Sequence, residues 1–151
     1  MPFRSAAESA LDRAAEALVR SARPDLIVLT GDLLDNDPRL APRLGRFVER
    51  LGPLAREGVV AISGNHDFFA GIGPFVASLE AGRADVLRNR GRVIGGAQGF
   101  ALLGVDDVWA ARRSRGGGPR LERATAGLPA IDGKLRRAPG LPRGLLWHNP
   151  V

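Results

Sequence analysis

The chain has 151 residues, enough for one domain with a buried core and too few for two. Its 44% hydrophobic and 25% charged residues are typical of globular proteins and exclude general disorder. The absence of cysteine excludes disulfides, thiolate metal sites and cysteine nucleophiles.

The net charge of +6 is unevenly divided, with −2 on residues 1–82 and +8 on residues 83–151. A basic half can attract phosphates, nucleic acid or an anionic lipid surface. No aromatic residues alternate with its arginines as a stacking platform for bases requires, so the sequence disfavours nucleic-acid binding. There is no membrane-length apolar run and no signal peptide, which indicates a soluble cytoplasmic chain as written. Membrane association or export stays open if an N-terminal segment is missing.

The predicted elements of the first half are a helix over 5–22, a strand over 25–30, an acidic loop over 31–38, a helix over 39–50 and a strand over 58–63. In the first helix, alanines and leucines at helical spacing are expected to face inward, with Asp12 and Glu16 on the outer side. The strand over 25–30 shows no polar alternation, which predicts burial on both faces beneath helices.

The predicted elements of the second half are a helix over 73–81, strands over 86–89, 92–94 and 100–105, one or two helical turns over 121–126, and a strand over 144–147. The Gly/Arg-rich segment 111–119 is assigned to no element. Alternating helices and strands predict a single domain over 1–151 with a layered α/β architecture and right-handed crossovers.

Polar residues follow three of the predicted strands: Asp32 the first, Asn65, His66 and Asp67 the second, and His148 the last. Ligands of open α/β sheets bind at this carboxyl edge. Carboxylate, amide and imidazole groups hold divalent Mn, Fe or Zn ions, and the two oxygens of Asp32 could bridge two ions. His66 could carry a proton, with Asp67 fixing its tautomer and orientation.

Three segments in this order resemble the calcineurin-like metallophosphoesterases: Leu29-Thr30-Gly31-Asp32, Gly64-Asn65-His66-Asp67 and Leu145-Leu146-Trp147-His148-Asn149-Pro150. Two further segments, Val86-Leu87-Arg88-Asn89 and Leu103-Gly104-Val105-Asp106-Asp107, look like the bacterial YkuE-type branch of that family. The resemblance runs from about Pro24 to the C-terminus and implies a metallophosphoesterase-type α/β sandwich.

The resemblance also implies hydrolysis of phosphomonoesters or phosphodiesters by a metal-activated hydroxide. Asp32 would bridge two divalent ions, and Asn65 and His148 would bind the second. His66 would stabilise the transition state or protonate the leaving oxygen, and Asp67 would orient His66. The substrate would be a phosphoester, with lipid-linked and nucleotide-linked esters both open, as is the oligomeric state.

The chain departs from the family pattern at both ends. The family has an Asp-x-His at the end of a first strand and a Gly-His-x-His near its end, and neither occurs here. The first metal would then keep Asp32 alone, so at most one ion is expected, and bulky Trp147 would crowd the site. The expectation is therefore a truncated enzyme, incomplete at both ends. The alternative is a non-catalytic remnant or binding module with an incomplete metal site.

Other polar groups are given structural interpretations. Asp106 and Asp107 are interpreted as a turn or a solvated pair. Asp35, Asn36 and Asp37 are interpreted as turn and helix-capping residues. The arginines of the segment 111–119 are interpreted as a solvated loop in preference to a phosphate or lipid contact.

Overall fold

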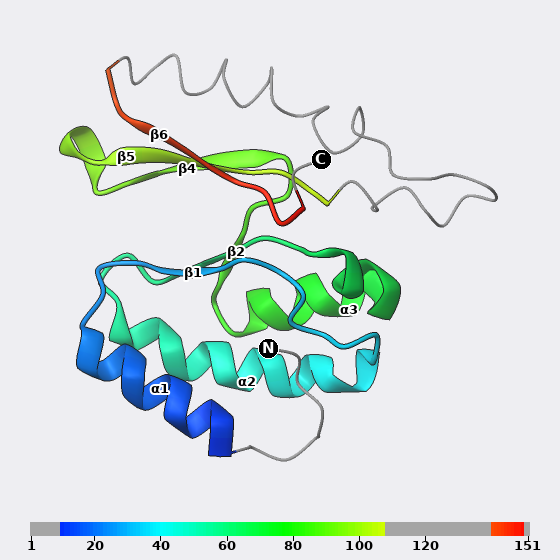
Figure 1. Ribbon diagram of the computed structural model, residues 1–151. Coiled ribbons are helices and arrows are strands. Elements are labelled where there is room, and N and C mark those ends of the chain that lie inside the picture. The colour runs from blue at the N-terminus through cyan, green and yellow to red at the C-terminus, as the bar shows by residue number, and fades with distance from the viewer. Residues whose placement is uncertain (1–9, 108–139, 150–151) are drawn as a thin grey trace.

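The computed structural model describes residues 10–107 and 140–149, and Figure 1 shows their arrangement. The helices are α1 (Ala10–Ala22), α2 (Ala41–Leu51) and α3 (Asn65–Ala81). The strands are β1 (Ile27–Leu29), β2 (Val59–Ala61), β3 (Asp85–Val86), β4 (Arg90–Ile94), β5 (Phe100–Gly104) and β6 (Arg143–Leu146). Short 3-10 helices cover Pro38–Leu40, Gly52–Leu54 and Gly96–Gln98. The predicted helical turns over 121–126 and the segment 111–119 lie outside the described residues.

The described strands form two three-stranded sheets. The first has the order β1-β2-β3 and is entirely parallel, with Ile27 opposite Val59 and Val60 opposite Asp85. The second has the order β4-β5-β6, in which β5 runs antiparallel to β4 and parallel to β6. The predicted layered α/β architecture is confirmed.

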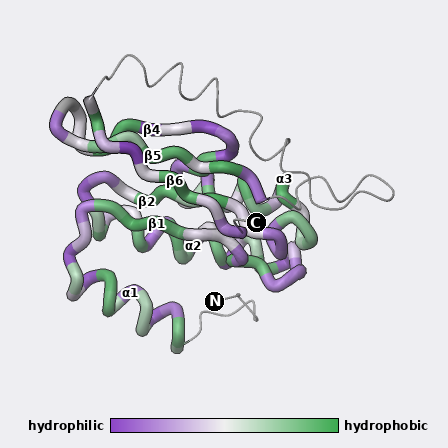
Figure 2. Tube along the Cα trace, turned by 45° about the horizontal axis from the view of Figure 1, so that its top comes forward, coloured by the Kyte–Doolittle hydropathy of each residue, from purple (hydrophilic) through white to green (hydrophobic). Residues whose placement is uncertain are grey.

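The layers follow from the alternation of side chains along β1. Ile27 and Leu29 point into the core shared with the helices, whereas Leu26 and Val28 point into the core between the two sheets. Figure 1 shows the resulting order of helices, first sheet and second sheet, and Figure 2 shows hydrophobic segments along the strands of both sheets. The expectation that helices cover both faces of β1 is therefore wrong, because the second sheet covers one of them.

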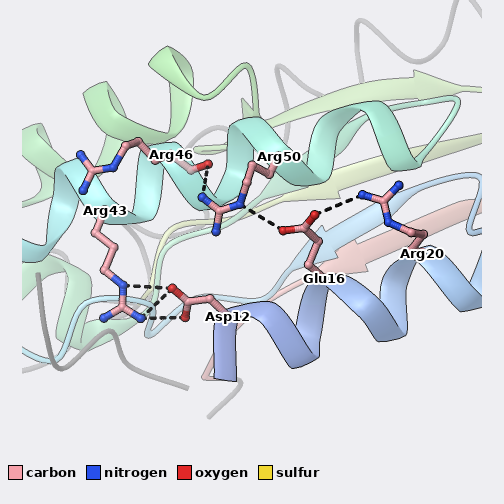
Figure 3. A network of polar contacts seen from close by, with 6 residues as sticks. All are labelled: Asp12, Glu16, Arg20, Arg43, Arg46 and Arg50. Atoms are coloured by element: carbon pink, nitrogen blue, oxygen red, sulfur yellow. Dashed lines mark hydrogen bonds and ion pairs between the residues drawn. The ribbon is translucent and has the colours of Figure 1, made fainter. Parts of the chain in front are cut away.

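The predicted orientation of α1 is also wrong. Asp12 is only 6% exposed, while Leu11 and Leu18 are 47% and 71% exposed. The Asp12 carboxylate lies against the Arg43 guanidinium of α2, with nitrogen–oxygen distances of 2.6–3.0 Å (Figure 3). Glu16 of the same face accepts a hydrogen bond of 3.0 Å from Arg50 Nε. The charged face of α1 turns inward because α2 supplies its counter-ions.

Helix α3 begins much earlier than predicted. It starts at Asn65 instead of residue 73, and it is broken at Gly71, whose φ of 115° is not helical. The residues of the Gly64–Asp67 motif therefore occupy a helix N-terminus directly after β2. None of the helices in the described part of the chain is both long and apolar enough to cross a lipid bilayer.

Candidate metal centre

Two loops meet at the carboxyl edge of the first sheet, one after β1 and one after β2. A Cβ atom at Gly31 would lie 2.5 Å from the Gly64 amide nitrogen, and one at Gly64 would lie 2.2 Å from Oδ1 of Asp32. Both distances are shorter than any real Cβ contact, so the loops can touch only where glycine stands. Asp32 itself adopts a left-handed φ of 54°, a strained conformation for a residue with a side chain.

Asp67 holds these two loops together. Its Oδ2 accepts hydrogen bonds from the backbone N–H groups of Asp32 and Gly64, at 2.8 and 2.9 Å. Its Oδ1 accepts from Leu33 and Leu34, at 3.0 and 2.9 Å. The side chain is fully buried, and this burial raises the pKa of Asp67 to about 6 against the opposing effect of the N–H donors, so the carboxyl is charged at neutral pH.

These contacts differ from the expectation that Asp67 orients the His66 ring. Both carboxylate oxygens of Asp67 are occupied by backbone N–H groups. The contact of Asp67 with the site is therefore through the backbone of Asp32 and Gly64, whose positions it fixes.

The Asp32 carboxylate lies between the start of α3 and the end of β6. Its Oδ1 accepts the backbone N–H of His66 at 2.9 Å. Its Oδ2 lies 3.2 Å from Nε2 of His148, which follows β6 in the second sheet. Each Asp32 oxygen is thus engaged from a different direction.

The His148 ring has a fixed tautomer. Its Nδ1 lies 2.7 Å from the backbone carbonyl oxygen of Thr30, which can only accept a hydrogen bond, so Nδ1 carries a proton. In the neutral ring, Nε2 then directs a lone pair at Oδ2 of Asp32. Two electron-rich atoms remain this close when a positive charge lies between them, either a proton or a metal ion. Donation from one ring nitrogen to a carbonyl is also how metal-binding histidines are oriented.

His66 and Asn65 occupy the first turn of α3. The His66 side chain is 39% exposed, and its Nδ1 has no hydrogen-bond partner and lies 3.9 Å from Oδ1 of Asp35. The ring meets the Phe69 ring edge-on, with 5.9 Å between centroids. Asn65 is half-buried. The structure thus brings the His66 backbone N–H and the His148 ring against the Asp32 carboxylate, while the His66 ring lies near Asp35 and Phe69.

The described residues bring few metal donors together at this site. Within residues 10–107 and 140–149, no three His, Cys, Asp or Glu side chains converge closely enough to hold a metal ion. One carboxylate oxygen and one imidazole nitrogen do face each other, in Asp32 and His148, and Asn65 begins α3 next to His66 in the chain. Oxygen and imidazole donors fit Mn, Fe or Zn.

The interpretation of Asp106 and Asp107 as a turn or a solvated pair is wrong. Asp106 is 6% exposed and is not part of a solvated pair, because Nε and Nη2 of Arg88 donate to its two oxygens at 3.0 and 2.7 Å. Asp107 is fully buried. The sequence feature that points to this ion pair is the position of an arginine and an aspartate at the ends of two predicted strands.

The comparisons with known proteins give one finding. The family model described as calcineurin-like phosphoesterase matches residues 6–122. This range contains Asp32, the Gly64–Asp67 motif and the Arg88–Asp106 pair, and it ends before His148. No curated protein and no solved structure gives a significant match.

Proposed function

Because the chain belongs to the calcineurin-like phosphoesterase family, we propose that it is a metal-dependent hydrolase of phosphomonoesters or phosphodiesters. Membership rests on a match to more than half of the chain. The segments around Arg88 and Asp106 support placing it in the bacterial YkuE-type branch.

The observation that carries the proposal is the arrangement of Asp32 and His148. The Thr30 carbonyl holds the proton of His148 on Nδ1, which leaves Nε2 to face Oδ2 of Asp32 at 3.2 Å. We infer that a divalent cation can take the place of a proton between these two atoms and be shared by both. Asn65 at the start of α3 adds an amide oxygen donor.

Each residue has a proposed task. Asp32, Asn65 and His148 hold one divalent ion, for which Mn, Fe and Zn are candidates. Such an ion supplies a polarised water and a positive charge for the phosphoryl oxygens. The partly exposed His66 ring donates a proton to the leaving oxygen. Asp67 keeps the loops of Asp32 and Gly64 in register.

The proposed substrates are phosphoesters, including lipid-linked and nucleotide-linked ones. We expect a single ion, because the Asp-x-His and Gly-His-x-His segments that supply further ligands in the family do not occur in this sequence.

A second candidate function is a non-catalytic module that binds one cation or a phosphate. It is favoured by the small donor set, because within the described residues no third acidic or imidazole side chain joins Asp32 and His148. Metal-dependent turnover separates the two candidates.

The test is hydrolysis of bis-p-nitrophenyl phosphate and p-nitrophenyl phosphate by the purified chain, with and without added Mn. The variants are Asp32→Ala, His66→Ala and His148→Ala, and the matched control is Asp37→Ala, a partly exposed aspartate of the same loop that pairs with Arg39. Turnover that requires Mn, disappears in the first three variants and survives in the control supports the hydrolase. No turnover from a folded chain that still binds Mn favours the binding module.

A further inference from the structure

A second network of polar groups lies beside the proposed metal centre and has no task in the function above. Its centre is the ion pair of Arg88, after β3, with Asp106, after β5, in which two nitrogens meet two oxygens. The Asp106 side chain is 8% exposed and that of Arg88 is 38% exposed. This two-pronged geometry fixes the guanidinium in one plane.

The ion pair reaches the Gly64–Asp67 motif from both sides. On one side, Ser63 Oγ donates to Oδ1 of Asp106 at 3.4 Å. On the other, the Arg88 guanidinium lies over the Phe68 ring, 5.5 Å from its centroid, a cation–π arrangement. Ser63 and Phe68 are the residues immediately before and after the motif.

The network is itself anchored to both sheets. The Asp106 backbone N–H donates to Oδ1 of Asn89 at 3.0 Å, which joins the segment after β5 to the segment after β3. The adjacent Val105 N–H donates to the Leu146 carbonyl of β6 at 3.2 Å, two residues before His148. The same rigid unit therefore touches the segments that carry Asn65, His66 and His148.

We propose that Arg88 and Asp106 are positioning residues, which hold the start of α3, where Asn65 and His66 lie, against the loop of Asp32. Neither residue is among the proposed metal ligands or proton donors. Arg88 acts on the motif through the Phe68 ring, and Asp106 acts through the Ser63 hydroxyl. This inference rests on the proposed function for its kinetic test and on the loop geometry alone for its second test.

A matched control exists on the other side of the first sheet. Arg43 and Asp12 form an ion pair of the same chemistry on helices α2 and α1, which carry none of the proposed site residues. Asp12 is as buried as Asp106, whereas Arg43 is more buried than Arg88, at 6% against 38% exposed. Arg88→Gln and Arg43→Gln both leave a buried aspartate without its arginine, so both lower stability. Only Arg88→Gln releases the Gly64–Asp67 motif.

The kinetic test measures kcat and KM for bis-p-nitrophenyl phosphate at saturating Mn in Arg88→Gln, Arg88→Lys and Arg43→Gln. Since small displacements of catalytic groups are costly, Arg88→Gln lowers kcat about 10- to 100-fold with little change in KM. Arg88→Lys recovers part of kcat because it keeps the charge and one donor, and Arg43→Gln retains kcat. Equal losses of kcat in Arg88→Gln and Arg43→Gln would reduce the pair to a structural role and overturn the proposal.

The second test needs no turnover and separates this inference from the proposed function. It measures amide hydrogen exchange at Gly64 and His66, which donate to Asp67 and Asp32, relative to Val60 in the core of β2. In Arg88→Gln the two loop amides exchange about tenfold faster relative to Val60, and in Arg43→Gln the ratio is unchanged. An unchanged ratio in Arg88→Gln overturns the positioning role even if the chain is an active hydrolase. If the wild type shows no turnover, the proposed function fails and the exchange ratio still decides this inference.

Discussion

His148 and Asp32 follow strands of different sheets, β6 and β1, and Nε2 of His148 lies 3.2 Å from Oδ2 of Asp32. The Thr30 carbonyl, two residues before Asp32, accepts the Nδ1 proton of the same ring at 2.7 Å. The end of β1 thus both orients the histidine and supplies the carboxylate that faces it. A cation bound there would join the two sheets at their shared edge.

Gly64→Ala tests the close approach of the two loops. The added Cβ would lie 2.2 Å from Oδ1 of Asp32 and 2.5 Å from its backbone nitrogen, so the carboxylate must move. We expect Mn-dependent turnover to fall at least about 100-fold, since displacements near 1 Å have this effect. The measurement is kcat for bis-p-nitrophenyl phosphate. Gly52→Ala is the control, because a Cβ there meets nothing within 4 Å; equal turnover in the two variants would contradict the proposed crowding.

Asp67→Asn tests whether the Asp67 carboxylate holds the two loops together. Four backbone N–H groups point at the two carboxylate oxygens, and an amide replaces one oxygen with a donor. We expect a loss of about 2 to 4 kcal/mol in the free energy of unfolding, because buried N–H groups lose their acceptor. Urea denaturation followed by circular dichroism measures it. Asp37→Asn, in the exposed pair with Arg39, should leave the midpoint unchanged. A similar shift in both variants would contradict the role of Asp67 in joining the loops.

The buried pair of Asp12 and Arg43 yields a double-mutant cycle. Asp12→Leu alone removes the carboxylate that faces the buried Arg43 guanidinium, and we expect the free energy of unfolding to fall by about 3 to 5 kcal/mol. Adding Arg43→Met should recover much of that loss, since a well-packed apolar pair often replaces a buried ion pair without penalty. Thermal unfolding of the two single variants and the double variant measures the coupling. Strict additivity would mean that the pair does not attach α1 to α2.

Local patterns in the sequence were sufficient for part of the fold. The unbroken apolar runs before Gly31 and Gly64 predicted two buried strands, and these pair in parallel and end at one edge. The prediction succeeds because strand formation and burial depend on neighbouring residues. The sequence pattern predicts neither the start of α3 at Asn65 nor its break at Gly71, because the helix begins within a motif that resembles a loop.

Long-range pairing could not be predicted from local patterns. Asp12 is buried because Arg43, 31 residues away, meets it, and helical periodicity alone placed this aspartate outside. Asp106 is buried for the same reason, because its partner Arg88 follows a strand of the other sheet. Amphipathic patterns record polarity and carry no information about which charges find partners.

The most direct test of the metal centre is a calorimetric titration of the purified chain with Mn²⁺. We predict one ion per chain, and an affinity at least about tenfold weaker in Asp32→Asn and His148→Gln, because each variant removes or weakens one donor. Asp37→Asn, in the same loop, should bind Mn as the wild type does. Equal binding by the wild type and the Asp32 and His148 variants, or no binding by the folded wild type, would contradict a metal site formed by Asp32 and His148.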